Sequence, residues 1–358
     1  MSTTVISTNA NTSKTIRLTN GKNFTYVSNA ASTEESIPII DVSRMYSDKL
    51  ADRQALAEDI RQAAHSIGFF CITSHNINME LVSDVMEQAK GFFALPEEKK
   101  MEVSSELIPD EYCGYHGMQR YNPNGWKYRD LYEAFNWNYN PAKDPDHPDP
   151  LTPQINLWPK DMPEFEEKLS AYQTEMIRFA RRLTRMFALA LHVPEDFYDE
   201  HVKQPEAGLR ILHYPQQEAR RDEQNGIGAH TDVEFFTIIT SDAEGLEVLS
   251  KSGHWIKVKP IPGCLVVNIA DCFMRQTNDF FVSTVHRVIN ESGRERYSVP
   301  FFWGINRKTL LSPVPTCVSE ENPNKYPVMT AGEYYLWRTR RQKRSWLVGE
   351  NQNETSTE

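Results

Sequence analysis

The fold and the chemistry of this chain are indicated most clearly by one stretch, Gly228-Ala229-His230-Thr231-Asp232-Val233-Glu234-Phe235-Phe236-Thr237-Ile238-Ile239-Thr240. Its second half is β-branched and aromatic, which is typical of a buried strand. His230 and Asp232 are separated by one residue, so on an extended chain both side chains leave from the same face. We therefore expect the two side chains to reach a common ion. Such a pair also arises by chance, and it needs support from elsewhere in the chain.

A second histidine, His286, lies far downstream in the segment 281–289, which also has the composition of a strand. Side chains alternate between the two faces of a strand, so the His286 imidazole lies on the same face as apolar neighbours. There it needs a polar partner such as a metal ion. His230, Asp232 and His286 would leave three positions open on one side of that ion. Fe(II) needs this arrangement to bind a co-substrate and dioxygen together.

A further signal is Arg296-Tyr297-Ser298, ten residues beyond His286. Arg296 and Ser298 alternate to one face of an expected strand, 296–303. A guanidinium grips a carboxylate through two hydrogen bonds, and a nearby hydroxyl adds a third. The alternative is an arginine that reaches water or pairs with an acidic side chain. Beside three candidate metal ligands, a dicarboxylate such as 2-oxoglutarate explains both features, with one end on the metal and the other on Arg296.

Together with their flanks, these residues resemble the isopenicillin N synthase-like branch of the Fe(II)/2-oxoglutarate-dependent dioxygenases. The resemblance runs from about residue 37 to about residue 340, with its landmarks in the expected order. These landmarks are Ile37-Pro38-Ile39-Ile40-Asp41, Ile67-Gly68-Phe69-Phe70, Phe92-Phe93-Ala94-Leu95-Pro96, Asn156-Leu157-Trp158-Pro159 and Leu209-Arg210-Ile211-Leu212-His213-Tyr214-Pro215.

The resemblance implies a role for each matching residue. The iron ligands would be His230, Asp232 and His286. Arg296 and Ser298 would hold the far carboxylate of 2-oxoglutarate, and Tyr214 would form a hydrogen bond with that co-substrate near the metal. The cofactors implied are Fe(II), 2-oxoglutarate and O2, with no catalytic residue beyond the metal ligands. Two departures from the family pattern are Leu212, where the family often carries Asn, and Ala270, which replaces a glycine.

The reaction implied is oxidation of an unactivated C–H bond of a small organic molecule, with succinate and CO2 as co-products. Hydroxylation, desaturation and ring rearrangement all remain open, and specialised (secondary) metabolite biosynthesis is the favoured setting. One alternative is a nucleobase dioxygenase of the thymine type. Another is an oxidase like isopenicillin N synthase, which needs no 2-oxoglutarate and binds its substrate carboxylate with the Arg-x-Ser pair. A non-catalytic binding module is the least favoured alternative.

The segment 114–137 is unusually aromatic, and by family analogy part of it borders the substrate pocket. The expected substrate-binding residues are Tyr115, Phe135 and Phe235. Such a lining would suit an apolar or aromatic molecule. The alternative is that most of these rings pack the loop against the rest of the protein.

The composition narrows the functional class. The formal net charge of −10 over 358 residues disfavours nucleic acid as a partner. Five cysteines without CxxC spacing indicate free thiols in a reducing compartment. No stretch approaches the roughly 20 apolar residues of a membrane span, and no signal peptide is recognisable, so we expect a cytoplasmic protein without a membrane partner. The sequence does not indicate the oligomeric state.

The expected fold class is α+β, mainly β: a double-stranded β-helix (jelly roll) with an N-terminal α/β region and a long bracing helix. We expect a flexible extension at 1–36 with a possible hairpin around Asn20-Gly21, an α/β region at 37–195, a jelly-roll core with a C-terminal helix at 196–347 and a disordered tail at 348–358. Helices are predicted at 50–66, 79–93, from Pro163 onward and at 334–347. The strands of the core are predicted at 209–214, 235–240, 246–249, 255–258, 264–270, 281–289 and 296–303.

Overall fold

The structure is a computed structural model that describes residues 13–18, 20–27, 35–108, 112–120, 128–144, 146, 155–217 and 223–347. For residues 341–347 it describes the backbone alone. The expected disordered lead-in and the expected tail at 348–358 lie outside the described residues.

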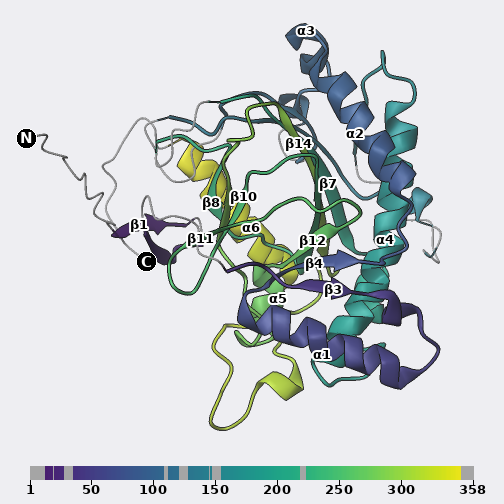
Figure 1. Ribbon diagram of the computed structural model, residues 1–358, viewed down its shortest axis with the longest axis vertical. Helices are drawn as coiled ribbons and strands as arrows, with labels where there is room; N and C mark the ends of the chain where they lie inside the picture. The colour runs from purple at the N-terminus through teal and green to yellow at the C-terminus, as the bar shows by residue number, and fades with distance from the viewer. Residues whose placement is uncertain are drawn as a thin grey trace, which may run out of the picture.

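Three long helices lie beside the sheets, two of them on the right of the view and one across the bottom (Figure 1). They are α1 (Leu50–Ser66), α2 (Met79–Phe93) and α4 (Phe165–Ala190). The first two have the predicted bounds. Along α4, apolar side chains at three-to-four spacing are buried against strands of the large sheet, which confirms the predicted bracing helix. The other helices are α3 (Glu97–Met101), α5 (Asp271–Gln276) and α6 (Ala331–Leu347).

A large sheet forms one wall of the core. Its strands run in the order β3 (Ile39–Asp41), β4 (Phe69–Thr73), β12 (Leu265–Ile269), β9 (Phe236–Ser241), β14 (Arg296–Gly304), β7 (Glu206–Tyr214), β6 (Glu133–Trp137) and β5 (Gly114–His116). All neighbours are antiparallel except β3 and β4. Since β4 and β6 come from the N-terminal half and flank the strands of the jelly roll, the two halves of the chain share one sheet.

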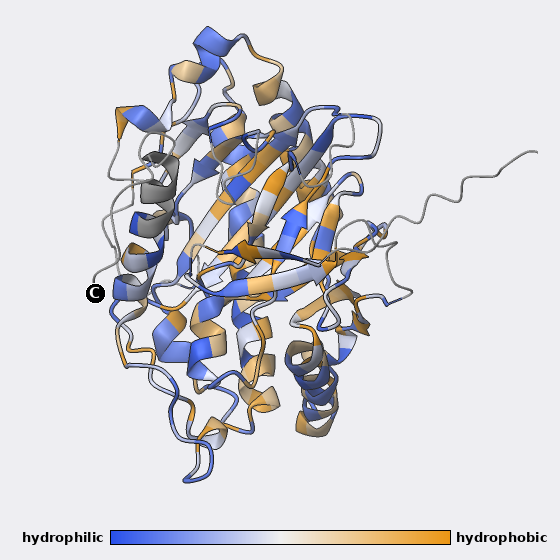
Figure 2. Ribbon diagram, turned by 90° about the vertical axis from the view of Figure 1, so that its left-hand side faces the viewer, coloured by the Kyte–Doolittle hydropathy of each residue, from blue (hydrophilic) through white to orange (hydrophobic). Residues whose placement is uncertain are grey.

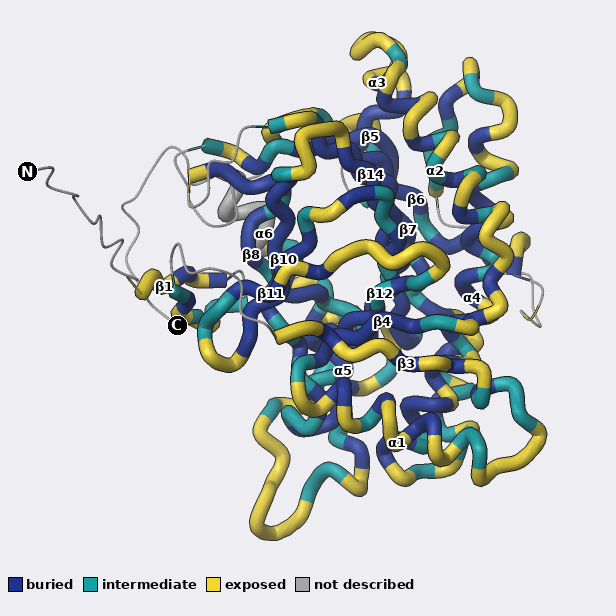
Figure 3. The backbone as a smooth tube through the Cα atoms, in the orientation of Figure 1, coloured by how far each residue is buried: buried dark blue, intermediate teal, exposed yellow. Residues whose placement is uncertain are grey.

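A smaller sheet forms the opposite wall, with the order β11 (Trp255–Lys257), β10 (Leu246–Leu249), β13 (His286–Val288) and β8 (Ile227–His230). The hydrophobic residues gather on the strands of the two sheets (Figure 2), and the central backbone is buried while the outer loops are exposed (Figure 3). Two antiparallel sheets of short strands around one interior are the expected jelly roll.

The predicted N-terminal hairpin is present and belongs to the folded core. Strands β1 (Ser13–Arg17) and β2 (Asn23–Val27) pair in antiparallel register around a turn in which Gly21 has a φ of 82°. Leu18 and Tyr26 of the hairpin are buried against Ala229 and Val285, which are neighbours of two candidate metal ligands. The prediction of a hairpin is confirmed.

One local prediction was wrong. The strand expected at 281–289 is limited to His286–Val288, because the preceding residues bond to the end of α1 instead: Val282 N–H donates to Ala64 O, and Thr284 Oγ1 donates to Ile67 O. Gly68 permits this contact, since a Cβ there would lie 1.9 Å from the Val282 carbonyl oxygen. The stretch after Ala270 forms the short helix α5, for which no element was predicted.

Candidate metal centre and its cavity

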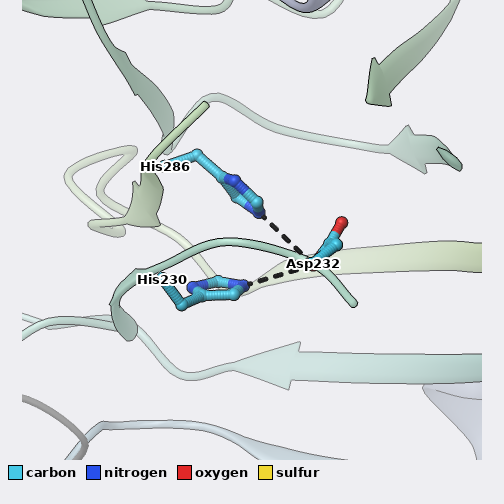
Figure 4. Close-up of side chains that lie close together, drawn as sticks. All are labelled: His230, Asp232 and His286. Atoms are coloured by element: carbon cyan, nitrogen blue, oxygen red, sulfur yellow. Dashed lines mark ion pairs between the residues drawn. The ribbon is translucent and has the colours of Figure 1, made fainter. Parts of the chain in front are cut away.

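His230, Asp232 and His286 converge at one point between the two sheets (Figure 4). One ligand atom from each lies within 4.8 Å of the other two. The Nε2 atoms of His230 and His286 are each 3.7 Å from Oδ1 of Asp232. The strands β8 and β13 are hydrogen-bonded neighbours, with His230 directly opposite His286, and this register brings the two imidazoles together.

Backbone carbonyls fix the orientation of both imidazoles. His230 Nδ1 donates to Gly228 O at 2.8 Å, and His286 Nδ1 donates to Thr284 O at 3.1 Å. A proton held on Nδ1 leaves the lone pair of Nε2 free, and this is the tautomer that binds a metal. Both Nε2 atoms point at the same place, so the pair is preorganised as ligands.

The sequence had suggested that Asp232 and His230 lie on one extended strand. In the structure they do not. β8 ends at His230, and Asp232 lies in the following loop. Its Oδ2 accepts hydrogen bonds from Thr237 Oγ1 at 2.5 Å and from Asn268 Nδ2 at 2.7 Å. These two donors occupy one carboxyl oxygen and turn Oδ1 toward the imidazoles, which favours a carboxylate that binds through one oxygen.

The protonation states suit metal binding. Burial and the neighbouring His286 lower the pKa of His230 to about 4, so its imidazole is neutral at pH 7. Burial alone would raise the pKa of Asp232, but the two imidazoles and the hydrogen bonds from Thr237 and Asn268 outweigh it and hold that pKa below its usual value. Two imidazoles and one carboxylate fit a divalent ion such as Fe(II).

Arg296 lies in the same cavity, with only 1% of its surface exposed. Its Nε donates to Ala243 O at 3.1 Å, and the guanidinium lies over the ring of Tyr214, 4.8 Å from the ring centroid. Its Nη1 is buried without a hydrogen-bond partner. A buried cation with an unused donor is costly, and an anion in the cavity would relieve that cost. The guanidinium therefore fits the carboxylate of 2-oxoglutarate.

Strand pairing places the other expected contacts beside Arg296. In the register of β14 with β7, Arg296 is opposite Tyr214 and Ser298 is opposite Leu212. All four residues line the cavity and are buried. Leu212 offers no side-chain donor or acceptor at this place. Gly245 makes room for the arginine, since a Cβ there would lie 3.2 Å from Arg296 Cδ and Nε.

The cavity has a volume of about 210 Å³, and its lining is more polar than the sequence suggested. Besides the groups above, it contains three further carboxyl groups and three further guanidinium groups: Asp130, Glu206, Glu234, Arg210, Arg307 and Arg338. Tyr132 and Trp137 are its aromatic contribution from the described part of segment 114–137. The expected aromatic lining is therefore shared with charged groups that the sequence analysis did not place there.

The three expected substrate-binding residues lie elsewhere. Tyr115 is buried and bonds through its hydroxyl to Glu133 and Glu97, and Phe135 packs on Phe92 in the core. Phe235 is stacked on Phe273, with ring centroids 4.5 Å apart. None of the three expected residues lines the cavity. Asn136, the next residue of β6, lines the cavity instead of Phe135.

Several residues of the site were not identified from the sequence. Thr237 and Asn268 orient Asp232, and Asp130 accepts a hydrogen bond from Gly228 N–H at 2.9 Å, beside the carbonyl that orients His230. Period two along 235–240 places Thr237 on the face opposite Phe236, and this signal could have identified it. Asp130 precedes β6 in a segment without a recognisable pattern.

Comparisons with known proteins agree with this site. Residues 37–161 match a family model described as the N-terminal part of a non-haem dioxygenase in morphine synthesis, and residues 205–305 match the 2OG-Fe(II) oxygenase superfamily. Within the described residues, no helix combines the length and the apolar character needed to cross a membrane.

Relatives and solved structures point the same way. The chain is 37% identical to a 2-oxoglutarate-Fe(II) type oxidoreductase, ppzC, of Metarhizium majus, over 81% of this chain and 83% of that protein. It is 33% identical to a homoarginine-6-hydroxylase of Oryza sativa subsp. japonica, over 84% and 96% of the two chains. The crystal structure of a full-length Neurospora crassa protein in complex with α-ketoglutarate and thymine superposes with a TM-score of 0.75 and 26% identity, covering 88% of this chain and all of that one (100%). With its His-Asp-His triad and its buried arginine, the chain belongs to the Fe(II)/2-oxoglutarate-dependent dioxygenases and uses Fe(II) and 2-oxoglutarate.

Proposed function

We propose that the protein oxidises an unactivated C–H bond of a small organic molecule that carries a basic nitrogen or an N–H group. In this proposal His230, Asp232 and His286 hold Fe(II), and Arg296, Ser298 and Tyr214 hold 2-oxoglutarate. The observation that best supports this proposal is that the three candidate ligands and the unsatisfied guanidinium of Arg296 line one cavity. The bound iron and 2-oxoglutarate supply the oxidising equivalents from O2, with succinate and CO2 as co-products.

The chain's own residues have three tasks in this reaction. The carbonyls of Gly228 and Thr284 keep both imidazoles in the tautomer that binds metal. Thr237 and Asn268 keep one oxygen of Asp232 occupied and the other directed at the ion. The two sheets and α6 line the cavity and shield part of it from bulk water.

The substrate class is inferred from the charges on the cavity wall. Asp130 is 3% exposed, and within the described part of the chain no lysine or arginine pairs with it. Burial raises its pKa to about 8. Two of the cations that line the cavity are already engaged: Arg307 pairs with Glu206 at 2.8 Å, and Arg338 pairs with Asp271. A positively charged nitrogen in the substrate would compensate the ionised form of Asp130.

Two more acceptors support the same class. Asn136 Oδ1 is buried without a partner, while its Nδ2 lies 3.0 Å from His116 Nε2. Glu234 lines the cavity beside Glu206, and Gly304 leaves space for both side chains. The homoarginine hydroxylase among the relatives is named for a substrate with such a nitrogen. Specialised metabolism is the setting that we propose, as expected from the resemblance.

The first experiment tests the reaction class. Anaerobic addition of Fe(II) and 2-oxoglutarate should produce a weak visible charge-transfer band, and exposure to O2 should convert 2-oxoglutarate to succinate. His230→Ala should lose the band. An isopenicillin N synthase-like oxidase would instead consume O2 with its substrate in the absence of 2-oxoglutarate. A chain that bound no Fe(II) would be a binding module, and the proposal would be rejected.

A second experiment tests the substrate class by the perturbation of the same band. Homoarginine and homocitrulline form a matched pair, because they differ in a charged guanidinium against a neutral urea. We expect homoarginine to perturb the band more strongly, and Asp130→Asn to remove the difference. Thymine tests the nucleobase alternative, which the Neurospora structure supports. A band that responds to thymine and to neither amino acid would contradict the proposed class.

A further inference from the structure

Thr231, the residue between His230 and Asp232, is contacted by segments from both ends of the chain. From the N-terminal hairpin, Asn20 Nδ2 donates to Thr231 Oγ1 at 3.3 Å. From the C-terminal helix α6, Arg338 Nη2 donates to the Thr231 carbonyl oxygen at 3.0 Å. Thr231 is 4% exposed. The loop that carries one candidate ligand and follows another is therefore held from two sides.

Asp271, the first residue of α5, is the centre of this contact network. Its side chain is fully buried, and its Oδ2 accepts from Arg338 Nη1, from Tyr334 Oη at 2.9 Å and from Thr231 Oγ1 at 3.3 Å. Its other oxygen accepts from Ser283 Oγ at 2.7 Å, in the segment that leads to His286.

The network also reaches Asp232 directly. Asp271 N–H donates to the Asp232 carbonyl oxygen at 3.0 Å. Asp271 therefore connects the loop of His230 and Asp232 with the segment before His286. Arg338 supplies the charge that compensates Asp271, since the two form an ion pair with side-chain exposures of 4% and 1%. Removing one partner of such a buried pair leaves an uncompensated charge.

The segments that supply Asn20 and Arg338 lie outside both family matches, which cover 37–161 and 205–305. Thr231 and Asp271 lie inside the second match. The part of the chain that matches the family models therefore contains the candidate ligands. Helix α6, which lies outside those matches, supplies the Arg338 guanidinium that holds their loop. The same helix lines the cavity with Tyr335, Arg338 and Thr339.

We propose that Arg338 is a positioning residue for the iron site: through Asp271 and the Thr231 carbonyl it sets the relative position of His230 and Asp232. The proposal rests on the proposed assignment of these two residues as iron ligands. Because binding effects are reciprocal, an ion that needs this loop geometry stabilises the docked α6, and the docked helix strengthens ion binding. The affinity for Fe(II) and the protection of the α6 amides from hydrogen exchange are therefore coupled.

The test compares Fe(II) affinities in the full-length protein by anaerobic titration, monitored by the charge-transfer band at saturating 2-oxoglutarate. Loss of groups that orient metal ligands typically weakens metal binding about 10- to 100-fold, and we expect this range for Arg338→Met. Arg338→Lys restores the charge beside Asp271 but has only one nitrogen, so it should recover part of the loss. Arg340→Gln is the matched control, because Arg340 is exposed on the same helix; it should bind Fe(II) as the wild type does.

Equal Fe(II) affinities for Arg338→Met and Arg340→Gln would overturn the inference. His230→Ala separates the two proposals: if it abolishes Fe(II) binding while Arg338→Met does not, the ligand assignment stands and the positioning role fails. If His230→Ala retains Fe(II) binding, the ligand assignment itself fails.

A measurement on the wild-type protein covers the case in which Arg338→Met does not fold. Amide hydrogen exchange in 331–340 should slow when Fe(II) is added anaerobically, and exchange in helix α2, which is not part of the network described above, should not change. Exchange in α6 that is the same with and without bound Fe(II) would contradict the coupling. A purely structural ion pair would lower stability in the variant but would not make the protection of α6 depend on the metal.

Discussion

Replacement of Arg296 by Met tests the proposed 2-oxoglutarate site, because the structure predicts a small effect on stability without the co-substrate and a large effect with it. Arg296 is buried, and its Nη1 has no partner. In the absence of 2-oxoglutarate, the substitution removes one hydrogen bond to Ala243 O and the contact with the Tyr214 ring, each worth about 1 kcal/mol. It also removes a desolvated cation with an unsatisfied donor, a gain of at least similar size. The free energy of unfolding without 2-oxoglutarate should therefore change by no more than about 1 kcal/mol.

With 2-oxoglutarate the variant loses two charge-assisted hydrogen bonds to a carboxylate, each worth about 1.5–3 kcal/mol. A total loss of about 3–6 kcal/mol corresponds to a roughly 10²- to 10⁴-fold increase in Kd. At a 2-oxoglutarate concentration about 1,000 times the wild-type Kd, binding stabilises the wild type by about 4 kcal/mol. After a roughly 100-fold increase in Kd the same concentration would stabilise the variant by only about 1.4 kcal/mol.

The assay combines denaturant unfolding with a 2-oxoglutarate titration, both performed anaerobically at saturating Fe(II). Arg294→Gln is the control, because the Arg294 side chain is 59% exposed and lies in the loop before β14. This control should match the wild type in both measurements. A variant Arg296→Met that unfolds more easily by several kcal/mol without 2-oxoglutarate, yet binds 2-oxoglutarate with the wild-type Kd, would refute the reasoning and make Arg296 a structural residue.

Three further predictions concern the wall of the cavity, the metal loop and the fold. Burial raises the pKa of Asp130 from 3.8 to about 8, so the free energy of unfolding should fall as the pH rises from about 4 to about 8. Asp130→Asn should remove this dependence, and identical pH profiles of the wild type and the variant in urea unfolding would contradict it. Thr237→Val removes a donor to Asp232 and should weaken Fe(II) binding about 10-fold in an anaerobic titration, whereas an unchanged affinity would exclude an orienting role. Gly68→Ala should destabilise the protein by more than about 3 kcal/mol, because its Cβ would overlap the Val282 carbonyl. Gly263→Ala has a similar positive φ but open space around it, so it should cost only about 1 kcal/mol; equal losses for the two glycines would show that backbone strain, and not the contact, is responsible.

The sequence predicted those parts of the site whose chemistry is carried by residue type. Two histidines and an aspartate have few reasons to meet other than a metal, and the structure brings all three together. The buried arginine of β14 could be anticipated because the alternation of its strand turns it inward. The bounds of α1 and α2 followed from periodicity, since their apolar faces repeat without interruption.

The remaining features depend on contacts between distant segments. The β-branched composition of 281–285 favoured a strand, but hydrogen bonds with Ala64 and Ile67 hold this segment out of the sheet. Helix α5 has only six residues, too few for a periodic signal. Phe135 was expected to contact the substrate, but the next residue, Asn136, lines the cavity instead. Thr231, Asp271 and Arg338 meet only in the folded chain, and no local pattern indicates their contact.

The most direct test of the central claim is the position of the iron. Crystals grown anaerobically with Fe(II) and 2-oxoglutarate should give one anomalous peak at the iron absorption edge, bounded by Nε2 of His230, Nε2 of His286 and Oδ1 of Asp232, with the distal carboxylate of 2-oxoglutarate on Arg296. A peak at any other place, or a 2-oxoglutarate that leaves Arg296 without a partner, would contradict the account.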